Sequence, residues 1–157
     1  MLQPCLLRAL AVALNLDPNW FDPYFDDPIL IHRTIYYPSE SGVTRKHTDN
    51  GIFTVLIQEY FPTHSLWVST KNTWIDAVCL EDTFVINLRY MLPLWTNILF
   101  VSTLHELIHT LSRRIRISIP FFVYPNVKAT FEALETDKNI NATDIMLKKN
   151  NSIWFKK

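Results

Sequence analysis

Three short stretches of this 157-residue chain carry side chains that could do chemistry. The first is His47-Thr48-Asp49. If residues 45–49 form a strand, the side chains at positions 47 and 49 share one face, so this imidazole and carboxylate can point at one metal ion. An isolated pair of this kind is most often surface decoration, because a protein metal site needs three or four matched ligands. The pair therefore indicates a metal site only if the chain supplies a further ligand.

His105, far downstream, could be that ligand. A lone histidine is more often a satisfied core or surface residue than a ligand. Together with His47 and Asp49, however, it would complete a set of two histidines and one carboxylate. Such a set leaves coordination positions open and suits non-haem Fe(II) and oxygen chemistry.

The third stretch, residues 114–120, alternates strictly. The isoleucines at 115, 117 and 119 face one way, and Arg116 and Ser118 face the other. Taken alone, this pattern favours a half-exposed strand with a solvated polar face. The functional interpretation makes Arg116 a bidentate clamp for a carboxylate, supported by the Ser118 hydroxyl. The order of His-x-Asp, a distal histidine and then Arg-x-Ser is much harder to obtain by accident than any single piece.

A rival hypothesis comes from the segment His105-Glu106-Leu107-Ile108-His109, which matches the zinc metalloprotease signature H-E-x-x-H. On a helix, His105 and His109 would bind zinc on one face, and Glu106 would activate the water. The surrounding chain favours the first hypothesis, because it is rich in strands. The protease hypothesis also leaves His47, Asp49, Arg116 and Ser118 without a role.

The elements that must position these residues are short and β-rich. The chain has two glycines and nine prolines, so Pro, Asn and Asp must make its turns. We predict eight strands, at residues 30–37, 45–49, 53–58, 65–69, 74–78, 83–88, 100–108 and 115–124. Short strands separated by turn signals indicate a β-sandwich, jelly roll or barrel.

A helix is predicted at each end of the chain. At the N-terminus, Leu6, Leu7, Leu10 and Leu14 form the buried stripe of an amphipathic helix. A short helix is expected near residues 144–149. The sequence contains no internal repeat and no low-complexity linker, so we expect one domain over residues 1–157.

The motifs together resemble a known family. They are Tyr36-Tyr37-Pro38, His47-Thr48-Asp49, Phe84-Val85-Ile86-Asn87-Leu88, Leu94-Trp95-Thr96-Asn97, Ser102-Thr103-Leu104-His105 and Arg116-Ile117-Ser118-Ile119-Pro120-Phe121-Phe122. In order and spacing they resemble the catalytic core of the Fe(II)/2-oxoglutarate-dependent dioxygenases, in the isopenicillin N synthase-like branch. The resemblance covers about residues 6–126 and implies a mostly β double-stranded β-helix, or jelly roll.

The resemblance also implies roles for individual residues. His47, Asp49 and His105 would be the iron ligands. Arg116 and Ser118 would hold the distal carboxylate of 2-oxoglutarate, and Tyr37 would hydrogen-bond the same co-substrate. The implied activity is the hydroxylation-type oxidation of a small molecule with Fe(II), 2-oxoglutarate and O2.

The chain departs from the family pattern at several points. From the resemblance we expect it to be without the family's usual N-terminal region, so a non-catalytic, truncated jelly-roll remnant is the alternative hypothesis. Leu88-Arg89-Tyr90 replaces a frequent Ile-Gly-Asp turn, and Ile98-Leu99 replaces a glycine turn. If these turns keep a positive φ, Arg89 and Ile98 are strained, because that conformation favours glycine.

Composition excludes several classes of partner. Fifteen Lys and Arg balance fifteen Asp and Glu, and no basic stripe predicts nucleic-acid binding. No apolar run reaches the roughly 18 residues of a membrane-spanning helix, so no membrane association is expected. Two cysteines outside any metal or redox spacing indicate a reducing compartment, and we expect a cytoplasmic location.

Overall fold

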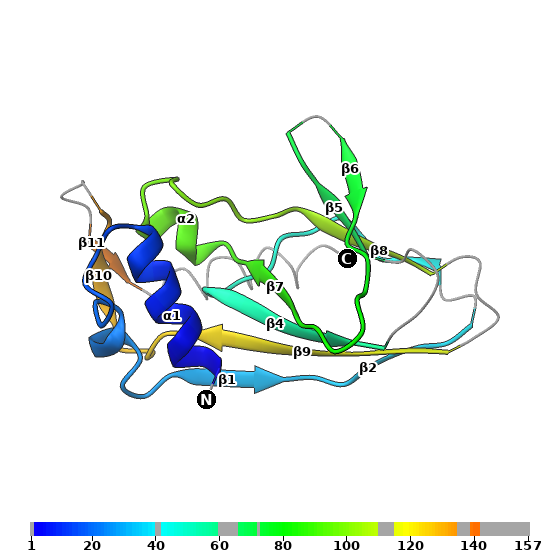
Figure 1. Ribbon diagram of the computed structural model, residues 1–157, viewed down its shortest axis with the longest axis horizontal. Helices are drawn as coiled ribbons and strands as arrows, with labels where there is room; N and C mark the ends of the chain where they lie inside the picture. The colour runs from blue at the N-terminus through cyan, green and yellow to red at the C-terminus, as the bar shows by residue number, and fades with distance from the viewer. Residues whose placement is uncertain are drawn as a thin grey trace.

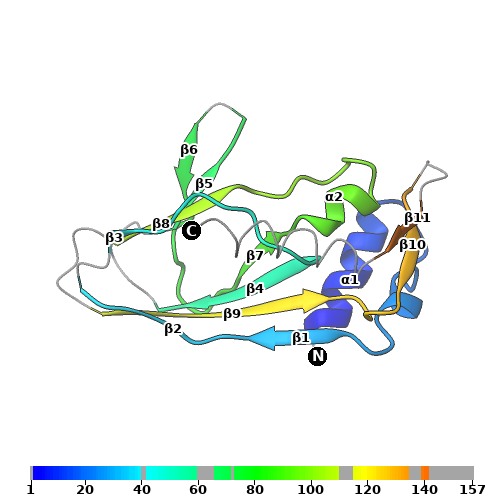
Figure 2. The ribbon, with the colours of Figure 1, turned by 180° about the vertical axis from the view of Figure 1, so that it is seen from behind.

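A computed structural model describes residues 2–39, 42–59, 66–71, 73–109, 115–134 and 139–141. Two antiparallel sheets dominate this part of the chain, and the smaller lies over one end of the larger (Figures 1 and 2). The larger has the order β1 (Ile29–His32), β9 (Arg116–Tyr124), β4 (Phe53–Gln58) and β7 (Val85–Leu88), with β2 (Ile35–Tyr37) also paired to β9. The smaller has the order β3 (Gly42–Val43), β8 (His105–His109), β5 (Leu66–Ser69) and β6 (Trp74–Asp76). This architecture confirms the predicted jelly roll.

The remaining elements gather at the opposite end of the larger sheet (Figure 1). They are α1 (Leu2–Ala13), the single 3-10 turn η1 (Asp22–Tyr24), α2 (Met91–Trp95) and the ribbon of β10 (Thr130–Glu132) with β11 (Asn139–Asn141). No helix in the described part of the chain is long and apolar enough to cross a membrane.

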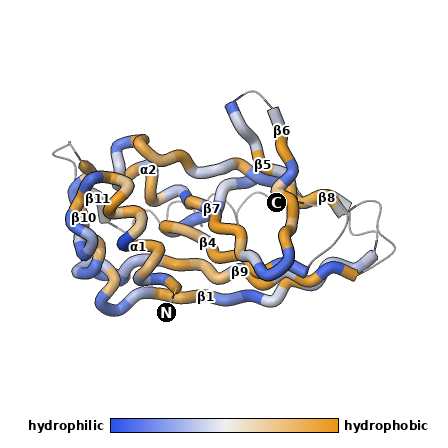
Figure 3. Tube along the Cα trace, in the orientation of Figure 1, coloured by the Kyte–Doolittle hydropathy of each residue, from blue (hydrophilic) through white to orange (hydrophobic). Residues whose placement is uncertain are grey.

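The hydrophobic core lies where α1 and α2 meet the larger sheet. Leu7 and Ala11, one helical turn apart on α1, are buried, and the predicted leucines 6, 10 and 14 pack against the same cluster. Trp95 of α2 is fully buried and stacks on Phe131 of β10 with ring centroids 3.8 Å apart. Figure 3 shows apolar residues along α1, α2 and the strands beneath them. Each such buried side chain stabilises the fold by roughly 1.5–3 kcal/mol.

The long central strand β9 turns its polar face inward. Arg116 and Ser118 are 1% and 4% exposed, whereas Ile117 and Phe121 on the other face are 41% and 40% exposed. The prediction of a solvated polar face, made from this segment alone, was therefore wrong. The reason is that the smaller sheet covers the polar face, and the alternation of one strand does not reveal which side is covered.

The predicted strand at residues 45–49 was also wrong. Only His47 forms an isolated β-bridge there. The strand predicted at 100–108 begins only at His105, and the short strands β3, β10 and β11 and the helix α2 were not predicted. The N-terminal helix is confirmed as α1, while the helix predicted at residues 144–149 lies outside the described residues.

The turn after α2 carries the strain that the sequence predicts. The Ile98 amide donates to the Pro93 carbonyl across Asn97, whose φ is 48°, as in a Schellman cap. Ile98 itself has a φ of 69° and is 74% exposed. The expectation was wrong for Arg89, which does not adopt a positive φ because it leads directly into α2. A β-branched residue at positive φ raises the free energy of the folded state, and the exposed Ile98 side chain makes few contacts that would offset this.

Replacing Ile98 by glycine should therefore stabilise the protein. We expect Ile98→Gly to raise the free energy of unfolding by about 1 kcal/mol, because relief of roughly 1–2 kcal/mol of strain exceeds the entropy cost of glycine. Chemical denaturation measures the change. Ile98→Ala is the matched control, since alanine keeps the Cβ atom and should gain much less. An equal gain in both variants would show that exposure of the side chain, and not φ, is responsible.

Candidate metal centre

His47 and His105 are brought together by their backbones. The His47 amide donates to the His105 carbonyl at 3.0 Å, and the His105 amide donates to the His47 carbonyl at 2.9 Å. Residues that exchange both hydrogen bonds across an antiparallel pair have Cα atoms about 5.5 Å apart and side chains on the same face. The two imidazole rings accordingly lie with centroids 4.4 Å apart. Two histidines far apart in the sequence thus become neighbours.

An irregularity in the strand pairing orients the His47 ring. The Thr44 amide donates to the Leu107 carbonyl, and the next pair along is His47 with His105. Arg45 and Lys46 therefore stand opposite Glu106 alone, as in a β-bulge, a feature that often re-aims side chains beside functional sites. The Arg45 carbonyl lies 2.7 Å from Nδ1 of His47. The bulge explains why residues 45–49 do not form the predicted strand.

Both imidazoles present the same nitrogen to the space between them. Nδ1 of His47 lies near the Arg45 carbonyl, and Nδ1 of His105 lies 3.0 Å from the Thr103 carbonyl. A carbonyl only accepts, so Nδ1 carries the hydrogen in each ring. Each neutral ring then has its lone pair on Nε2. Backbone carbonyls fix metal-binding histidines in this way.

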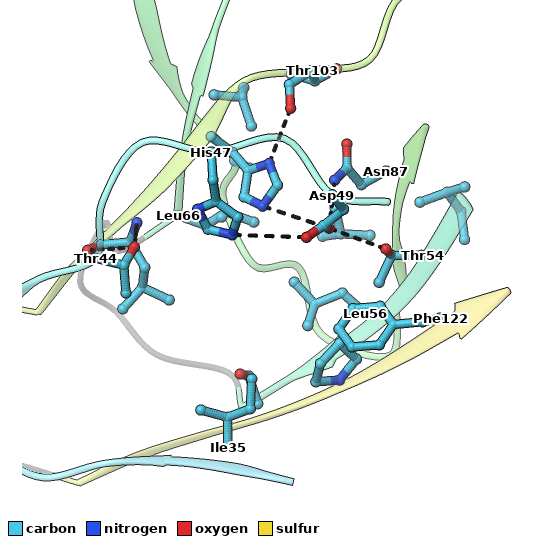
Figure 4. Close-up of a pocket in the computed structure, with 18 of the residues that line it drawn as sticks. Ile35, Thr44, His47, Asp49, Thr54, Leu56, Leu66, Asn87, Thr103 and Phe122 are labelled. Carbon is cyan, nitrogen blue, oxygen red and sulfur yellow. Dashed lines mark hydrogen bonds and ion pairs between the residues drawn. The ribbon is translucent and has the colours of Figure 1, made fainter. Parts of the chain in front are cut away.

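Asp49 faces both lone pairs. Its Oδ1 lies 3.8 Å from Nε2 of His47, and its Oδ2 lies 3.7 Å from Nε2 of His105 (Figure 4). One ligand atom from each of the three residues lies within 4.8 Å of the others. An unprotonated Nε2 and a carboxylate oxygen are both acceptors and repel each other unless a cation or a proton lies between them. The donor set therefore fits a divalent transition metal.

The Asp49 carboxylate is held by the larger sheet. Thr54 of β4 and Asn87 of β7, which are register partners, each donate to its Oδ2 at 3.3 Å. Arg89, directly after β7, places Nη2 3.7 Å from Oδ1. The sequence analysis missed all three residues, because the pairing of β4 with β7 is needed to bring them to Asp49. The centre consequently spans the two sheets.

A cavity of about 340 Å³ lies between the sheets beside these ligands, and that volume falls in the range of small-molecule sites. Its walls are mostly apolar, with Leu56 and Phe122 on the larger sheet and Leu66 on the smaller (Figure 4). The cavity lining includes all six residues that the sequence analysis selected: His47, Asp49, His105, Tyr37, Arg116 and Ser118.

Arg116 offers a buried positive charge to this cavity. Its Nη2 donates to Oε1 of Gln58 at 3.0 Å, while its Nη1 is buried without a hydrogen-bond partner among the described residues. Burial lowers the pKa of Arg116, with Tyr37 opposing that effect, but a guanidinium stays protonated in proteins. An unpaired buried donor is costly, and a carboxylate ligand would satisfy it. This side of the cavity therefore fits an anionic group.

Tyr37 and Ser118 adjoin that charge. Tyr37 is the register partner of Arg116 on β2, and its ring centroid lies 5.2 Å from the guanidinium carbon. Ser118 follows on the same face of β9, opposite Gln58 of β4. Sequence reasoning missed Gln58, whose place beside Arg116 follows only from the pairing of β4 with β9.

The zinc metalloprotease hypothesis is wrong. His105 and His109 lie at the two ends of strand β8 and not on a helix. Residues four apart in a strand have Cα atoms about 13 Å apart, too far to share one zinc ion. Glu106 lies on the opposite face from His105 because side chains alternate along a strand.

Comparison with known proteins agrees with this geometry. Residues 27–125 match the family model of the 2OG-Fe(II) oxygenase superfamily. The chain is 33% identical to a probable iron/ascorbate oxidoreductase of Dictyostelium discoideum, in an alignment 160 positions long that covers 88% of this chain and 44% of that protein. It is 34% identical to a homoarginine-6-hydroxylase of Glycine max, in an alignment 146 positions long that covers 85% of this chain and 44% of that protein. The chain therefore spans less than half the length of these relatives.

A solved structure shows the same fold. A full-length Neurospora crassa protein, crystallised with α-ketoglutarate and thymine, superposes with a TM-score of 0.84 at 27% identity. The superposition covers 98% of this chain and 53% of that one. A 2OG-Fe(II) oxygenase family protein of Caulobacter crescentus has a TM-score of 0.85 at 22% identity and supports the fold alone.

The partly buried His105 predicts a pH dependence of the metal-free protein. Burial lowers the pKa of His105, although its hydrogen bond to Thr103 and the charge of Asp49 oppose the effect. The unfolded state, with a histidine pKa of about 6.5, therefore takes up a proton before the folded state does. Stability from this group is complete above pH 6.5 and is lost as the pH falls towards the folded pKa.

Denaturation of chelator-treated protein across this pH range measures the effect. We expect His105→Gln to flatten the pH dependence, while the exposed control His32→Gln keeps the parent slope. A parent-like slope in His105→Gln would assign the pH dependence to another group.

Proposed function

The chain belongs to the 2OG-Fe(II) oxygenase superfamily, and from this premise we propose that it binds Fe(II) through His47, Asp49 and His105 and oxidises a small molecule. The observation that carries the proposal is the convergence of both histidine Nε2 atoms on one carboxylate, with each Nδ1 beside a backbone carbonyl. When bound, iron together with 2-oxoglutarate and O2 supplies the oxidising chemistry of a hydroxylation-type reaction. The balanced charge of the chain favours a small-molecule substrate over nucleic acid.

The protein's own contribution is geometry. The backbone bridge and the carbonyls of Arg45 and Thr103 hold both rings with Nε2 forward. Thr54 and Asn87 hold the carboxylate from the other sheet. The metal would therefore meet three ligands that are already oriented and that line the cavity.

Arg116, Ser118 and Tyr37 would receive the distal carboxylate of 2-oxoglutarate. Arg116 has a buried Nη1 that needs an acceptor, and Gln58 fixes the orientation of its guanidinium. The apolar cavity walls exclude water and strengthen the attraction between guanidinium and carboxylate. The order of the His-x-Asp, His and Arg-x-Ser motifs supports the isopenicillin N synthase-like branch within the superfamily.

Turnover of 2-oxoglutarate tests the proposal directly. Protein purified without oxygen is mixed with Fe(II) and 2-oxoglutarate, oxygen is admitted and succinate is assayed. We expect His47→Ala, Asp49→Ala and His105→Ala each to reduce succinate formation more than about 100-fold, because no ligand is spare. Glu106→Gln and His109→Ala are matched controls from the same strand and should keep parent activity. Metal binding without succinate formation in the parent would favour the non-catalytic remnant.

A second prediction separates co-substrate binding from metal binding. Arg116→Ala should weaken 2-oxoglutarate binding about 100-fold, because it removes a buried charge-assisted hydrogen bond worth a few kcal/mol. The affinity for Mn(II), measured in the absence of 2-oxoglutarate, should remain at the parent value. Arg33→Ala, at an exposed arginine between β1 and β2, should change neither affinity. Unchanged 2-oxoglutarate binding in Arg116→Ala would place the distal carboxylate elsewhere.

A further inference from the structure

Arg89 is a buried cation built into the metal centre. It is 3% exposed, and its Nη2 lies 3.7 Å from Oδ1 of Asp49. Its guanidinium carbon lies 4.3 Å from the ring centroid of Phe122 and 5.2 Å from that of Tyr124. Stacking on two aromatic rings offsets part of the cost of removing the charge from water. The surroundings therefore hold this guanidinium in one place.

Gly51 leaves the room that this arginine occupies. A Cβ atom at position 51 would lie 3.1 Å from Nη1 of Arg89 and 2.8 Å from the Val123 carbonyl oxygen. The φ of Gly51 is 112°, which other residues rarely adopt. The turn at Gly51 and the rings of Phe122 and Tyr124 thus enclose the Arg89 side chain next to Asp49.

Asp49 does not need Arg89 for its orientation. Thr54 and Asn87, both neutral, already donate to Oδ2. Arg89 approaches the other oxygen, Oδ1, and supplies charge there. A guanidinium cannot lose its proton in a protein, so this charge is permanent. It would repel a divalent cation held by the same carboxylate, in surroundings where burial weakens screening.

We propose that Arg89 is an internal counter-cation that competes with the metal for Asp49 and thereby lowers the affinity of the centre for divalent cations. The inference rests on the metal centre proposed above and adds what sets its affinity. Arg89 is a positioning residue in this sense, since it acts on the metal through Asp49. A centre of lower affinity fills and empties as the free metal concentration changes. When it is empty, Arg89 still balances the charge of Asp49.

Metal titration without turnover tests the inference. Calorimetric titration with Mn(II), in the absence of 2-oxoglutarate, gives the dissociation constant of the parent and of each variant. We expect Arg89→Gln and Arg89→Met to bind Mn(II) at least tenfold more tightly than the parent. Arg89→Lys keeps the charge and should stay within about threefold of the parent. Arg33→Met is the control for the aromatic contact, because exposed Arg33 lies over the same Phe122 ring at 5.8 Å, and it should leave the affinity unchanged.

The sign of the change decides between two roles. Unchanged or weaker binding in both neutral variants would overturn the inference and make Arg89 a support for the Asp49 geometry. Should Arg89→Met fail to fold, Arg89→Gln and Arg89→Lys still compare a neutral side chain with a charged one.

His47→Ala distinguishes this failure from failure of the metal centre. If His47→Ala loses Mn(II) binding but the Arg89 variants bind Mn(II) no more tightly than the parent, only the role of Arg89 is rejected. Binding that survives in His47→Ala rejects the centre itself, and with it the inference.

Discussion

The centre depends on one pair of backbone hydrogen bonds, those exchanged by His47 and His105. A reciprocal pair of this type sets the spacing and the face of both side chains at once, without any contact between the side chains. The bulge at Arg45 and Lys46 then interrupts the regular strand pairing and leaves the Arg45 carbonyl close to Nδ1 of His47, where it orients the ring. Strand register, and not side-chain packing, therefore brings the two imidazoles together.

Asp49 makes the centre a joint property of both sheets. His105 lies on the inner strand β8 of the smaller sheet with His47 bridged beside it, whereas Thr54 and Asn87 hold the carboxylate from the larger sheet. The apolar core around Trp95 lies at the other end of the larger sheet, beneath α1 and α2 (Figure 1). The apolar core that stabilises the fold and the contacts that orient the candidate ligands thus lie in separate regions of the molecule. A side-chain deletion in the core can lower stability without displacing the ligands, but a register shift at β8 turns His105 to the other face.

The sequence indicated the candidate ligands but not the reasons for their geometry. Residue types and their order pointed to His47, Asp49, His105 and the pair Arg116 and Ser118, and the structure places all five at one cavity. The i, i+2 argument placed His47 beside Asp49, as the structure has them, but through a strand that does not form. Residues 105–109 fit a helix and a strand equally well by local pattern; the strand-rich surroundings favour a strand, and pairing with β5 and β3 confirms it. Thr54, Gln58, Asn87 and Arg89 depend on cross-strand register, which a single sequence does not encode in any short motif.

Two buried arginines place positive charge at the cavity and beside it, and bound ligands can balance that charge together. Asp49 balances Arg89, while Arg116 has no carboxylate within ion-pair distance among the described residues. A divalent cation adds positive charge next to Arg89, and a dicarboxylate adds negative charge next to both the metal and Arg116. Each ligand therefore lowers the electrostatic cost of the other, and linkage makes the effect reciprocal. On the proposed function, the counter-cation at Arg89 weakens the metal most when the co-substrate is absent, so the protein favours the complete pair of ligands over the metal alone.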